Sequence, residues 1–360
     1  MMNLYDINGS IITNNISNKD IKDALLSAVA SGEVNLGNSV GATLSLNGLN
    51  SDWQTNAETV YKNLLTNYKK MPNKSIPIFI TTDQHGRGIE GNRFINNIDK
   101  DGMEITNINL GDTVTDVFNL EQLNTLLARS KSIKNYIAVP GNHEYKHGSE
   151  VMTNYDICRT FISSYNQQMC PNYPNCYTAI DGKHNVKYII MDNYYVNEEG
   201  TGYGEKSIDS TTSKWLINEL SKNDGYDIVY LQHWGMCPTK KLRTDKNESA
   251  WVENVGNSTV NYKLWQLLLA RKKKQSGTFT DMFGNSYDFD FSSCKNELLC
   301  TLHGHNHQEF YSIQDGLTAY GADWFGNSAG TFLLIDRKNN KLKVFKFNNT
   351  SVDDILELSI

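Results

Sequence analysis

The chain has 360 residues and a formal net charge of −6, with 34 basic and 40 acidic side chains mixed along its length. This length allows one large domain with a small appendage. The densest basic run, Arg271 to Lys274, is typical of a solvated helix end, so an obligatory nucleic-acid partner is not expected. No stretch approaches the roughly 18 apolar residues of a membrane span. Met1 to Ser10 lack the basic flank and apolar core of a secretory signal, which favours a soluble, cytoplasmic protein.

Residues 1 to 70 are rich in Asn, Ser and Gly. They predict a short hairpin or an extended arm near Tyr5 to Ile12, a helix at Lys19 to Ala30 and a second helix from Asp52 to about Tyr68. None of them is a plausible catalyst, so we interpret 1–70 as an N-terminal accessory or attachment segment and 71–360 as the main domain. The cysteines form no C-x-x-C pair, which disfavours a structural zinc knuckle. Free thiols are expected, with a disulfide among Cys158, Cys170 and Cys176 as the alternative.

From Ser75 onward, apolar strands alternate with helices, a pattern typical of an α/β fold. Strands are predicted at Ser75 to Thr82, Met103 to Leu110, Asn135 to Pro140, Val186 to Met191, Asp227 to Gln232 and Leu298 to Leu302. Because Pro77 has no N–H, pairing of the first strand is expected to start after it. Three last strands, Leu317 to Ala322, Thr331 to Asp336 and Lys341 to Phe347, predict an antiparallel finish. Helical periodicity runs through Val117 to Leu127, around Leu216 and through Val260 to Lys272, whereas Phe279 to Phe291 reads as a loop.

A short polar segment follows the carboxyl end of five of these strands. The segments are Asp83-Gln84-His85, Gly111-Asp112, Gly141-Asn142-His143-Glu144, His233 and Gly304-His305-Asn306-His307. In an open α/β sheet the loops after the carboxyl ends converge on one edge, where ligands bind. The five segments are therefore expected to form one site.

The residue types in these segments indicate two divalent cations. Asp83 and His85 stand at i and i+2, as do His305 and His307, so each pair can point to one side of an extended chain. Asp112, after a glycine turn, suits a carboxylate that bridges two ions. The Asn142 amide oxygen favours a hard ion such as Mn or Fe over a closed zinc site, and His143 is left for proton transfer. Two hard cations held in this way are a phosphoester-cleaving arrangement.

Other polar and aromatic residues have structural alternatives. Asp116 and Glu144 can cap helices or turns, and His303 is expected to be structural. His147 and His184 read as surface or hydrogen-bonded core histidines. Tyr194, Tyr195 and Trp234 could stack on a base or sugar, with packing as the alternative.

The five segments form the series D-x-H, G-D, G-N-H-E, H and G-H-x-H, at Asp83/His85, Asp112, Gly141 to Glu144, His233 and Gly304 to His307. This series resembles the motifs of the calcineurin-like metallophosphoesterase superfamily, and the resemblance covers about residues 75 to 350. The resemblance implies a four-layer α/β/β/α sandwich and makes 71–360 the catalytic domain. It assigns the first ion to Asp83, His85, Asp112 and His307, and the second to Asp112, Asn142, His233 and His305. It also implies in-line attack on phosphorus by a bridging hydroxide, with His143 stabilising charge and protonating the leaving group.

Two departures from the phosphoprotein phosphatase branch favour a more generic phosphodiesterase. Position 115 is Thr, with Asp116 one place later, and the arginines that clamp phosphate are missing, although Arg87 or Arg93 could substitute. Manganese is the expected metal, with Fe or Zn as alternatives. The first alternative function is a phosphomonoesterase on nucleotide or sugar phosphates. The second is a phage or prophage tail-associated structural protein that retains the fold, because LYDINGSII resembles the start of prophage tail-associated hydrolases; residues 1–70 would then contact a virion partner.

Overall fold

The computed structural model describes residues 49, 51–85, 89–113, 130–144, 176–192, 208–236, 242, 260–281, 283–325 and 328–360, together with short strands elsewhere. The chain divides into two compact units, Met1–Ser45 and Leu46–Ile360. In the first unit, β1 (Leu4–Tyr5) pairs antiparallel with β2 (Ile11–Thr13), so of the two predicted alternatives the structure has the short hairpin. The helices predicted at Lys19 to Ala30 and at Val117 to Leu127 lie outside the described residues.

Two mixed β-sheets form the centre of the second unit. The six-stranded sheet has the order β23 (Leu356–Ser359), β22 (Lys341–Phe347), β21 (Gly330–Asp336), β3 (Ser75–Thr81), β4 (Thr106–Asn109), β5 (Tyr136–Ala138). The seven-stranded sheet has the order β19 (Phe310–Gln314), β20 (Leu317–Gly321), β18 (Leu298–His303), β13 (Asp227–Gln232), β10 (Val186–Met191), β9 (Tyr173–Asp181), β8 (Gln167–Cys170). Strands β3, β4 and β5 are parallel to one another, as are β10, β13, β18 and β20.

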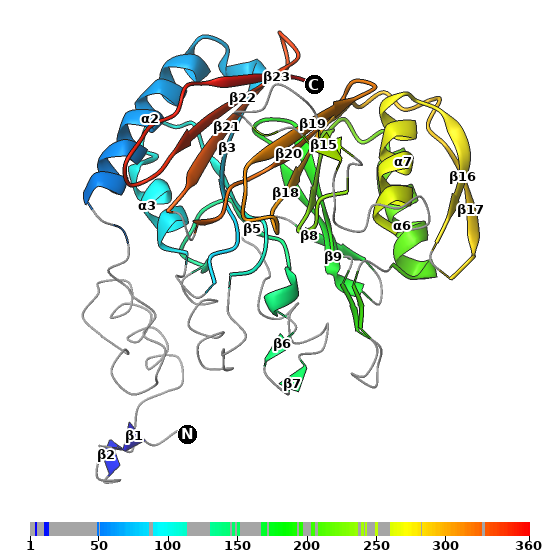
Figure 1. Ribbon diagram of the computed structural model, residues 1–360, viewed down its shortest axis with the longest axis horizontal. Helices are drawn as coiled ribbons and strands as arrows, with labels where there is room; N and C mark the ends of the chain where they lie inside the picture. Colours follow the sequence, from blue (N-terminus) through cyan, green and yellow to red (C-terminus); the bar gives the residue numbers. More distant parts are fainter. Residues whose placement is uncertain are drawn as a thin grey trace. The chain divides into compact units, whose positions relative to one another are not determined.

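Helices cover the outer face of each sheet (Figure 1). Helices α2 (Ser51–Lys69) and α3 (Glu90–Ile98) share a core with the six-stranded sheet. Helices α6 (Ser210–Ser221) and α7 (Val260–Lys272) share another with the seven-stranded sheet. A third core, between the two sheets, is built from the inner faces of both. These three apolar cores separate four layers, so the α/β/β/α sandwich expected from the sequence is confirmed.

Strand β3 shows why the buried runs became strands. Successive side chains of a strand point to opposite faces. Ile76, Ile78 and Ile80 enter the core between the sheets, whereas Phe79 enters the core under α2. Both faces are buried, which accounts for an uninterrupted apolar run. The prediction for Pro77 holds only towards β4, where pairing begins at Ile78. Towards β21 the register begins at Ser75 and places Pro77 opposite Leu334.

Helix α2 belongs to the compact unit that contains both sheets. Its buried residues recur at helical spacing and form one apolar stripe: Trp53, Ala57, Val60, Tyr61, Leu64 and Tyr68. Trp53 is fully buried, lies against Phe94 and Phe347, and donates from Nε1 to the Ser328 carbonyl at 2.8 Å. The division at residue 70 stays a prediction, but this helix provides part of the core beneath the sheet.

Trp53→Phe is expected to lower the free energy of unfolding by about 1 to 3 kcal/mol, because the Ser328 carbonyl loses its indole donor while most ring packing is kept. Urea denaturation monitored by circular dichroism measures this change. Glu58→Ala, an exposed change on the same helix, is the control and should stay within about 0.5 kcal/mol. Equal stability of the two variants would contradict the structural role of Trp53.

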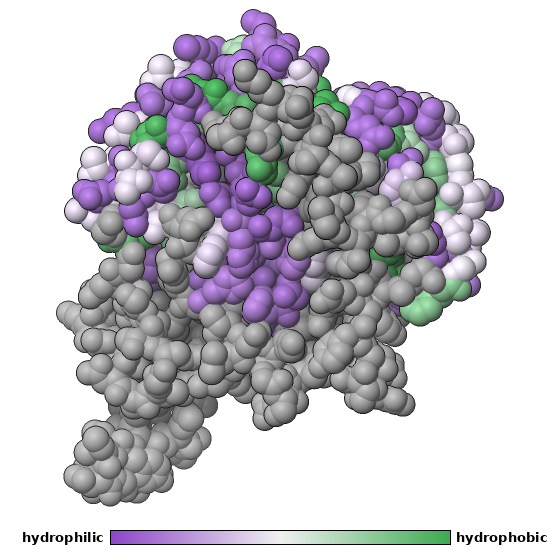
Figure 2. Space-filling model, viewed as in Figure 1, coloured by the Kyte–Doolittle hydropathy of each residue, from purple (hydrophilic) through white to green (hydrophobic). Residues whose placement is uncertain are grey.

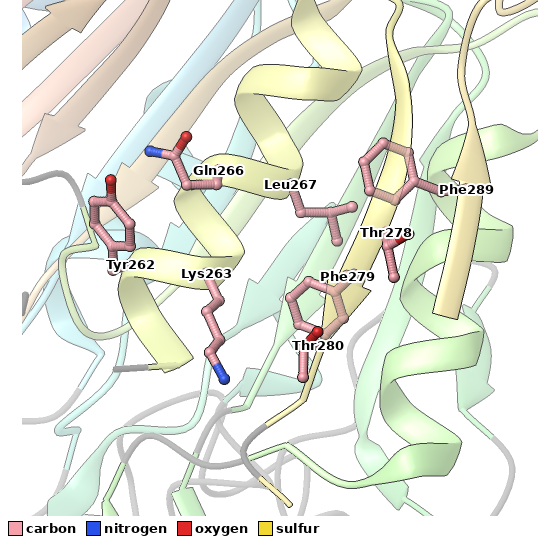
Figure 3. A pocket seen from close by; sticks show the side chains of 8 residues that line it. All are labelled: Tyr262, Lys263, Gln266, Leu267, Thr278, Phe279, Thr280 and Phe289. Atoms are coloured by element: carbon pink, nitrogen blue, oxygen red, sulfur yellow. The ribbon is translucent and has the colours of Figure 1, made fainter. Parts of the chain in front are cut away.

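Two sequence predictions were wrong. The segment Phe279 to Phe291 is not a loop, because β16 (Ser276–Thr280) and β17 (Ser286–Asp290) form a hairpin. A groove of about 240 Å³ lies between this hairpin and α7, with Leu267, Phe279 and Phe289 among its lining residues and none of the predicted site residues (Figure 3). The last strands also do not form one antiparallel group: β20 joins the seven-stranded sheet parallel to β18, whereas β21 and β22 join the other sheet.

Hydrophilic residues dominate the described part of the surface seen in Figure 2, with apolar residues scattered among them. The large apolar side chains that are exposed among the described residues are Phe283, Ile313, Val352 and Ile355. Within the same residues, no helix is both long enough and apolar enough to span a bilayer. Cys294 and Cys300 are buried free thiols, and Cys176 is buried with its Sγ 3.5 Å from the Asp192 carbonyl oxygen, whereas the side chains of Cys158 and Cys170 lie outside the description.

Candidate metal centre

The carboxyl ends of five parallel strands, three from one sheet and two from the other, supply the predicted ligands. Strands β3, β4 and β5 lead to Asp83, Asp112 and the 3-10 turn Asn142–Glu144. Strands β13 and β18 lead to His233 and to the segment with His305 and His307. Backbone bonds join neighbouring ends: Asp83 N donates to Gly111 O at 2.9 Å, and Gly304 N to His233 O at 2.9 Å.

Seven of the eight predicted site residues form three overlapping groups whose ligand atoms lie within 4.8 Å of one another. The groups are Asp83, His85 and His307; His85, Asp112 and His143; and Asp112, His233 and His305. In the first group, His307 Nε2 lies 3.1 Å from His85 Nε2 and 3.2 Å from Asp83 Oδ1. In the last, His233 Nε2 lies 3.2 Å from Asp112 Oδ2 and 3.2 Å from His305 Nδ1. Asp112 and His85 each belong to two groups.

These spacings fit bound cations. Ligand atoms about 2.1 Å from one ion stand roughly 3.0 to 3.4 Å apart at octahedral to tetrahedral angles. The eighth residue, Asn142, lies next to His143, and its Oδ1 is buried with no hydrogen-bond donor among the described residues. A buried acceptor without a donor is costly unless something binds it. The donor set of carboxylates, imidazoles and an amide oxygen suits two divalent ions.

The backbone is strained where these ligands stand. Residues other than glycine adopt positive φ rarely, and such strain collects at functional sites. Five of the eight predicted residues have φ between 44° and 70°: Asp83, His85, Asp112, His305 and His307. The surrounding fold must hold these residues in the left-handed region.

Two motif glycines permit the close approach of ligands. A Cβ on Gly111, whose φ is 104°, would stand 2.4 Å from His233 Nδ1. A Cβ on Gly141 would stand 2.3 Å from Asp112 Oδ1. Both distances are shorter than any real contact, so a larger residue at either position would displace a predicted ligand.

Glu144 joins two of the ligand-bearing turns. Its carboxylate is fully buried and accepts three backbone hydrogen bonds, from Asp112 N at 2.9 Å, Thr113 N at 2.7 Å and Gly141 N at 2.6 Å. Burial and the Asp112 charge raise the pKa of Glu144 to about 7, whereas the backbone donors oppose that rise. Glu144 therefore caps these turns, which is the structural role considered for it from the sequence.

Asp112 and His233 form a buried ion pair. Burial alone would lower the pKa of His233, but the Asp112 carboxylate raises it to about 10. Burial opposes ionisation of Asp112, yet the His233 charge holds the pKa of Asp112 well below its usual range. His233 Nδ1 donates to Leu110 O at 2.6 Å, which leaves Nε2 towards Asp112. An ion bound through this Nε2 replaces a proton, because imidazole ligates metals through a lone pair.

Among the remaining candidates, His143 is 26% exposed at its side chain, donates from its backbone N to Asp112 Oδ1, and lies edge-on to His85. Trp234 is 2% exposed and packs against His233 and His305. Of the two roles considered for it, stacking on a substrate or packing, the structure has packing. Arg93 is paired with Glu90 at 3.1 Å. His303 and His184 are buried in hydrogen-bonded positions. Arg87, Asp116 and the side chains of Tyr194, Tyr195 and His147 lie outside the described residues.

No protein-family model and no curated protein sequence matches the chain. Solved structures with a similar fold include a Streptococcus pneumoniae protein described as a phosphoesterase, at 9% identity and TM-score 0.33, covering 79% of this chain and 98% of that one. A Staphylococcus aureus protein described as a 5'-nucleotidase has 13% identity and TM-score 0.44, covering 79% and 54%. A phosphopantetheinyl hydrolase from Mycobacterium tuberculosis has 12% identity and TM-score 0.33, covering 70% and 91%. Similarity this low carries no argument about activity, so function must be inferred from the site residues.

Proposed function

We propose that the protein is a metal-dependent phosphoric ester hydrolase, and more narrowly a phosphodiesterase. The observation that supports this proposal is the pair of three-residue groups at one sheet edge, Asp83/His85/His307 and Asp112/His233/His305. Asp112 also belongs to a third group, with His85 and His143, and this third group shares one residue with each of the other two.

In this proposal, Asp83, His85, Asp112 and His307 hold the first ion, and Asp112, Asn142, His233 and His305 the second. We favour manganese because an amide oxygen belongs to the set. The bound ions supply Lewis acidity, which activates water and neutralises charge that develops on the phosphoryl oxygens. The protein contributes orientation: Glu144 fixes the turns of Asp112 and Asn142, and Leu110 O fixes the His233 ring.

His143 is the proposed proton donor. Its side chain is 26% exposed, and its backbone N–H donates to Asp112 Oδ1 at 2.9 Å, which fixes the turn that carries it. From this position it can give a proton to the leaving alkoxide, which a departing ester oxygen needs near neutral pH. General acid catalysis of this kind contributes about 10²- to 10⁴-fold.

A diester is preferred over a monoester because the phosphate-clamping arginines are absent from the G-D and G-N-H segments. The one described substitute, Arg93, is already paired with Glu90. A monoester dianion carries more charge than a diester and needs more cationic groups around its free oxygens.

The test is hydrolysis of bis-p-nitrophenyl phosphate against p-nitrophenyl phosphate with added Mn²⁺, for wild type and His143→Asn. Wild type should prefer the diester. On a diester with an alkyl leaving group, whose alkoxide needs a proton, the His143→Asn variant should lose about 10²-fold or more in kcat while still binding Mn²⁺. Chelation by EDTA should stop turnover, and re-addition of Mn²⁺ should restore it.

Cleavage of the monoester alone would favour the nucleotide or sugar phosphomonoesterase. Absence of both turnover and bound Mn²⁺ in wild type would contradict the hydrolase proposal and favour the tail-associated structural protein. An unchanged kcat of His143→Asn on the diester with an alkyl leaving group would remove His143 as proton donor, without affecting the proposed metal ligands.

A further inference from the structure

Trp324 lies in a segment that connects the ends of two ligand-bearing strands. The segment follows β20, and Ala322 N donates to His303 O at 2.9 Å, at the carboxyl end of β18. Phe325 N donates to Thr82 O at 3.0 Å, directly before Asp83 and after β3. Trp324 therefore stands between a strand end of the seven-stranded sheet and one of the six-stranded sheet.

The indole of Trp324 packs on the two imidazoles of the first ligand group. Its ring centroid lies 4.6 Å from that of His307 at an interplanar angle of 31°, so the two rings pack in a tilted arrangement. It lies 6.1 Å from the His85 ring at 85°, which is edge-to-face. The Nε2 atoms of these two imidazoles are the ones that stand 3.1 Å apart.

His307 has few other constraints among the described residues. Its side chain is 41% exposed. Among the described residues it makes polar contacts with His85 and Asp83, and both involve Nε2, the atom proposed to bind the ion. His233, in contrast, is fully buried and has its second ring nitrogen fixed by Leu110 O. A ligating histidine normally has its other nitrogen oriented by such a partner. For His307, the indole face takes the place of that partner.

Trp324 is itself held from both sides. Asp323 accepts a hydrogen bond from Trp324 N at 2.8 Å and pairs with Lys346 at 2.7 Å. On the other side, Phe325 is buried and lies against Trp53. Supports of this kind keep a side chain within the narrow geometry that a binding site needs.

From these contacts we infer that Trp324 is a positioning residue, which holds the exposed His307 imidazole in the orientation that binds the first ion. The inference rests on the proposed function, because it presupposes that His307 ligates a metal. It goes further in assigning a role to a residue that none of the sequence motifs contains.

The test is Mn²⁺ binding to the full-length protein, measured by electron paramagnetic resonance of free Mn²⁺. Trp324→Leu and Trp324→Ala should bind one ion about 10-fold more weakly, as expected for loss of an orienting partner, and leave the second ion nearly unchanged. Trp324→Phe keeps a planar face and should recover the affinity to within about 3-fold of wild type.

A double-mutant cycle with His307→Ala shows whether Trp324 acts through His307. In that background, Trp324→Leu should change Mn²⁺ affinity less than about 2-fold, because the ring that it orients is gone. Trp215→Ala, in α6, is the matched control: it should lower stability and leave Mn²⁺ affinity unchanged.

Fully additive effects of Trp324→Leu and His307→Ala would overturn the inference, as would unchanged Mn²⁺ binding in Trp324→Leu. Equal weakening of both ions with a lower melting temperature of the chelated protein would also overturn it, because that is the result of a purely structural role. If wild type itself neither binds Mn²⁺ nor hydrolyses esters, the proposed function fails. If wild type does both and the Trp324 variants bind normally, only the positioning role fails.

Discussion

Asp112→Asn is expected to lower Mn²⁺-dependent ester hydrolysis by about 10³-fold or more, which corresponds to about 4 kcal/mol of transition-state stabilisation. Asp112 is buried, belongs to two ligand groups, and pairs with His233 at 3.2 Å. Asparagine keeps the size of the side chain but removes the negative charge that two cations would share. Steady-state kinetics and the number of Mn²⁺ ions bound per chain, by equilibrium dialysis, measure the loss.

The same change at an exposed carboxylate, Asp315→Asn, is the control, and it should leave both readings unchanged. The chelated Asp112→Asn protein should remain folded by circular dichroism, because the amide can still accept the hydrogen bond from His143 N. If Asp112→Asn kept its turnover within about 10-fold of wild type, the reaction could not depend on a carboxylate between two ions.

Glu144→Ala is expected to combine two losses. It removes the acceptor of three buried backbone N–H groups, on Asp112, Thr113 and Gly141, and each unsatisfied donor costs about 1 to 3 kcal/mol. The free energy of unfolding should therefore fall by at least about 3 kcal/mol. Mn²⁺ affinity should fall about 10- to 100-fold as well, because the turn that places Asp112 is no longer held. Urea denaturation in EDTA and Mn²⁺ titration separate the two effects.

Glu144→Gln is expected to cause smaller losses of stability and Mn²⁺ affinity than Glu144→Ala. Its single acceptor oxygen can keep the bonds from Asp112 N and Gly141 N, but its amide group then faces the Thr113 N–H. Its losses should lie between those of wild type and Glu144→Ala. Glu219→Ala, another buried carboxylate change, should lower stability without changing Mn²⁺ affinity. An equal loss of Mn²⁺ affinity in both alanine variants would mean that the effect is general destabilisation.

The ligand-bearing strands could be recognised from the sequence because their signal is local. Strand β13, which leads to His233, appears at its predicted bounds, and so does its neighbour β10, since a run buried on both faces has few other solutions at this length. The polar residues directly after such runs stand out for the same reason. All eight predicted site residues lie at the carboxyl ends of strands in the structure.

The hairpin of β16 and β17 was missed because its strands are short, partly exposed and rich in Asp, Ser and Thr. Cross-strand bonds hold it, such as Thr278 to Asp288 at 2.8 Å, and Asp281 caps its turn by accepting from Phe283 N and Asn285 N. These contacts exist only once the register is set, and strands as polar and exposed as these specify their register only weakly through apolar residues.

The sequence by itself determined the α/β class, the strands that carry ligands and the chemical types of the candidate ligands, because each follows from residue type and local spacing. Only the tertiary structure decided that β20 and β21 belong to different sheets, that Glu144 joins two turns and that Trp324 packs on His307. Sheet membership and side-chain contacts depend on which distant segments pair. A buried apolar run shows that both its faces are covered, but the covering partner is chosen by the packing of the whole chain.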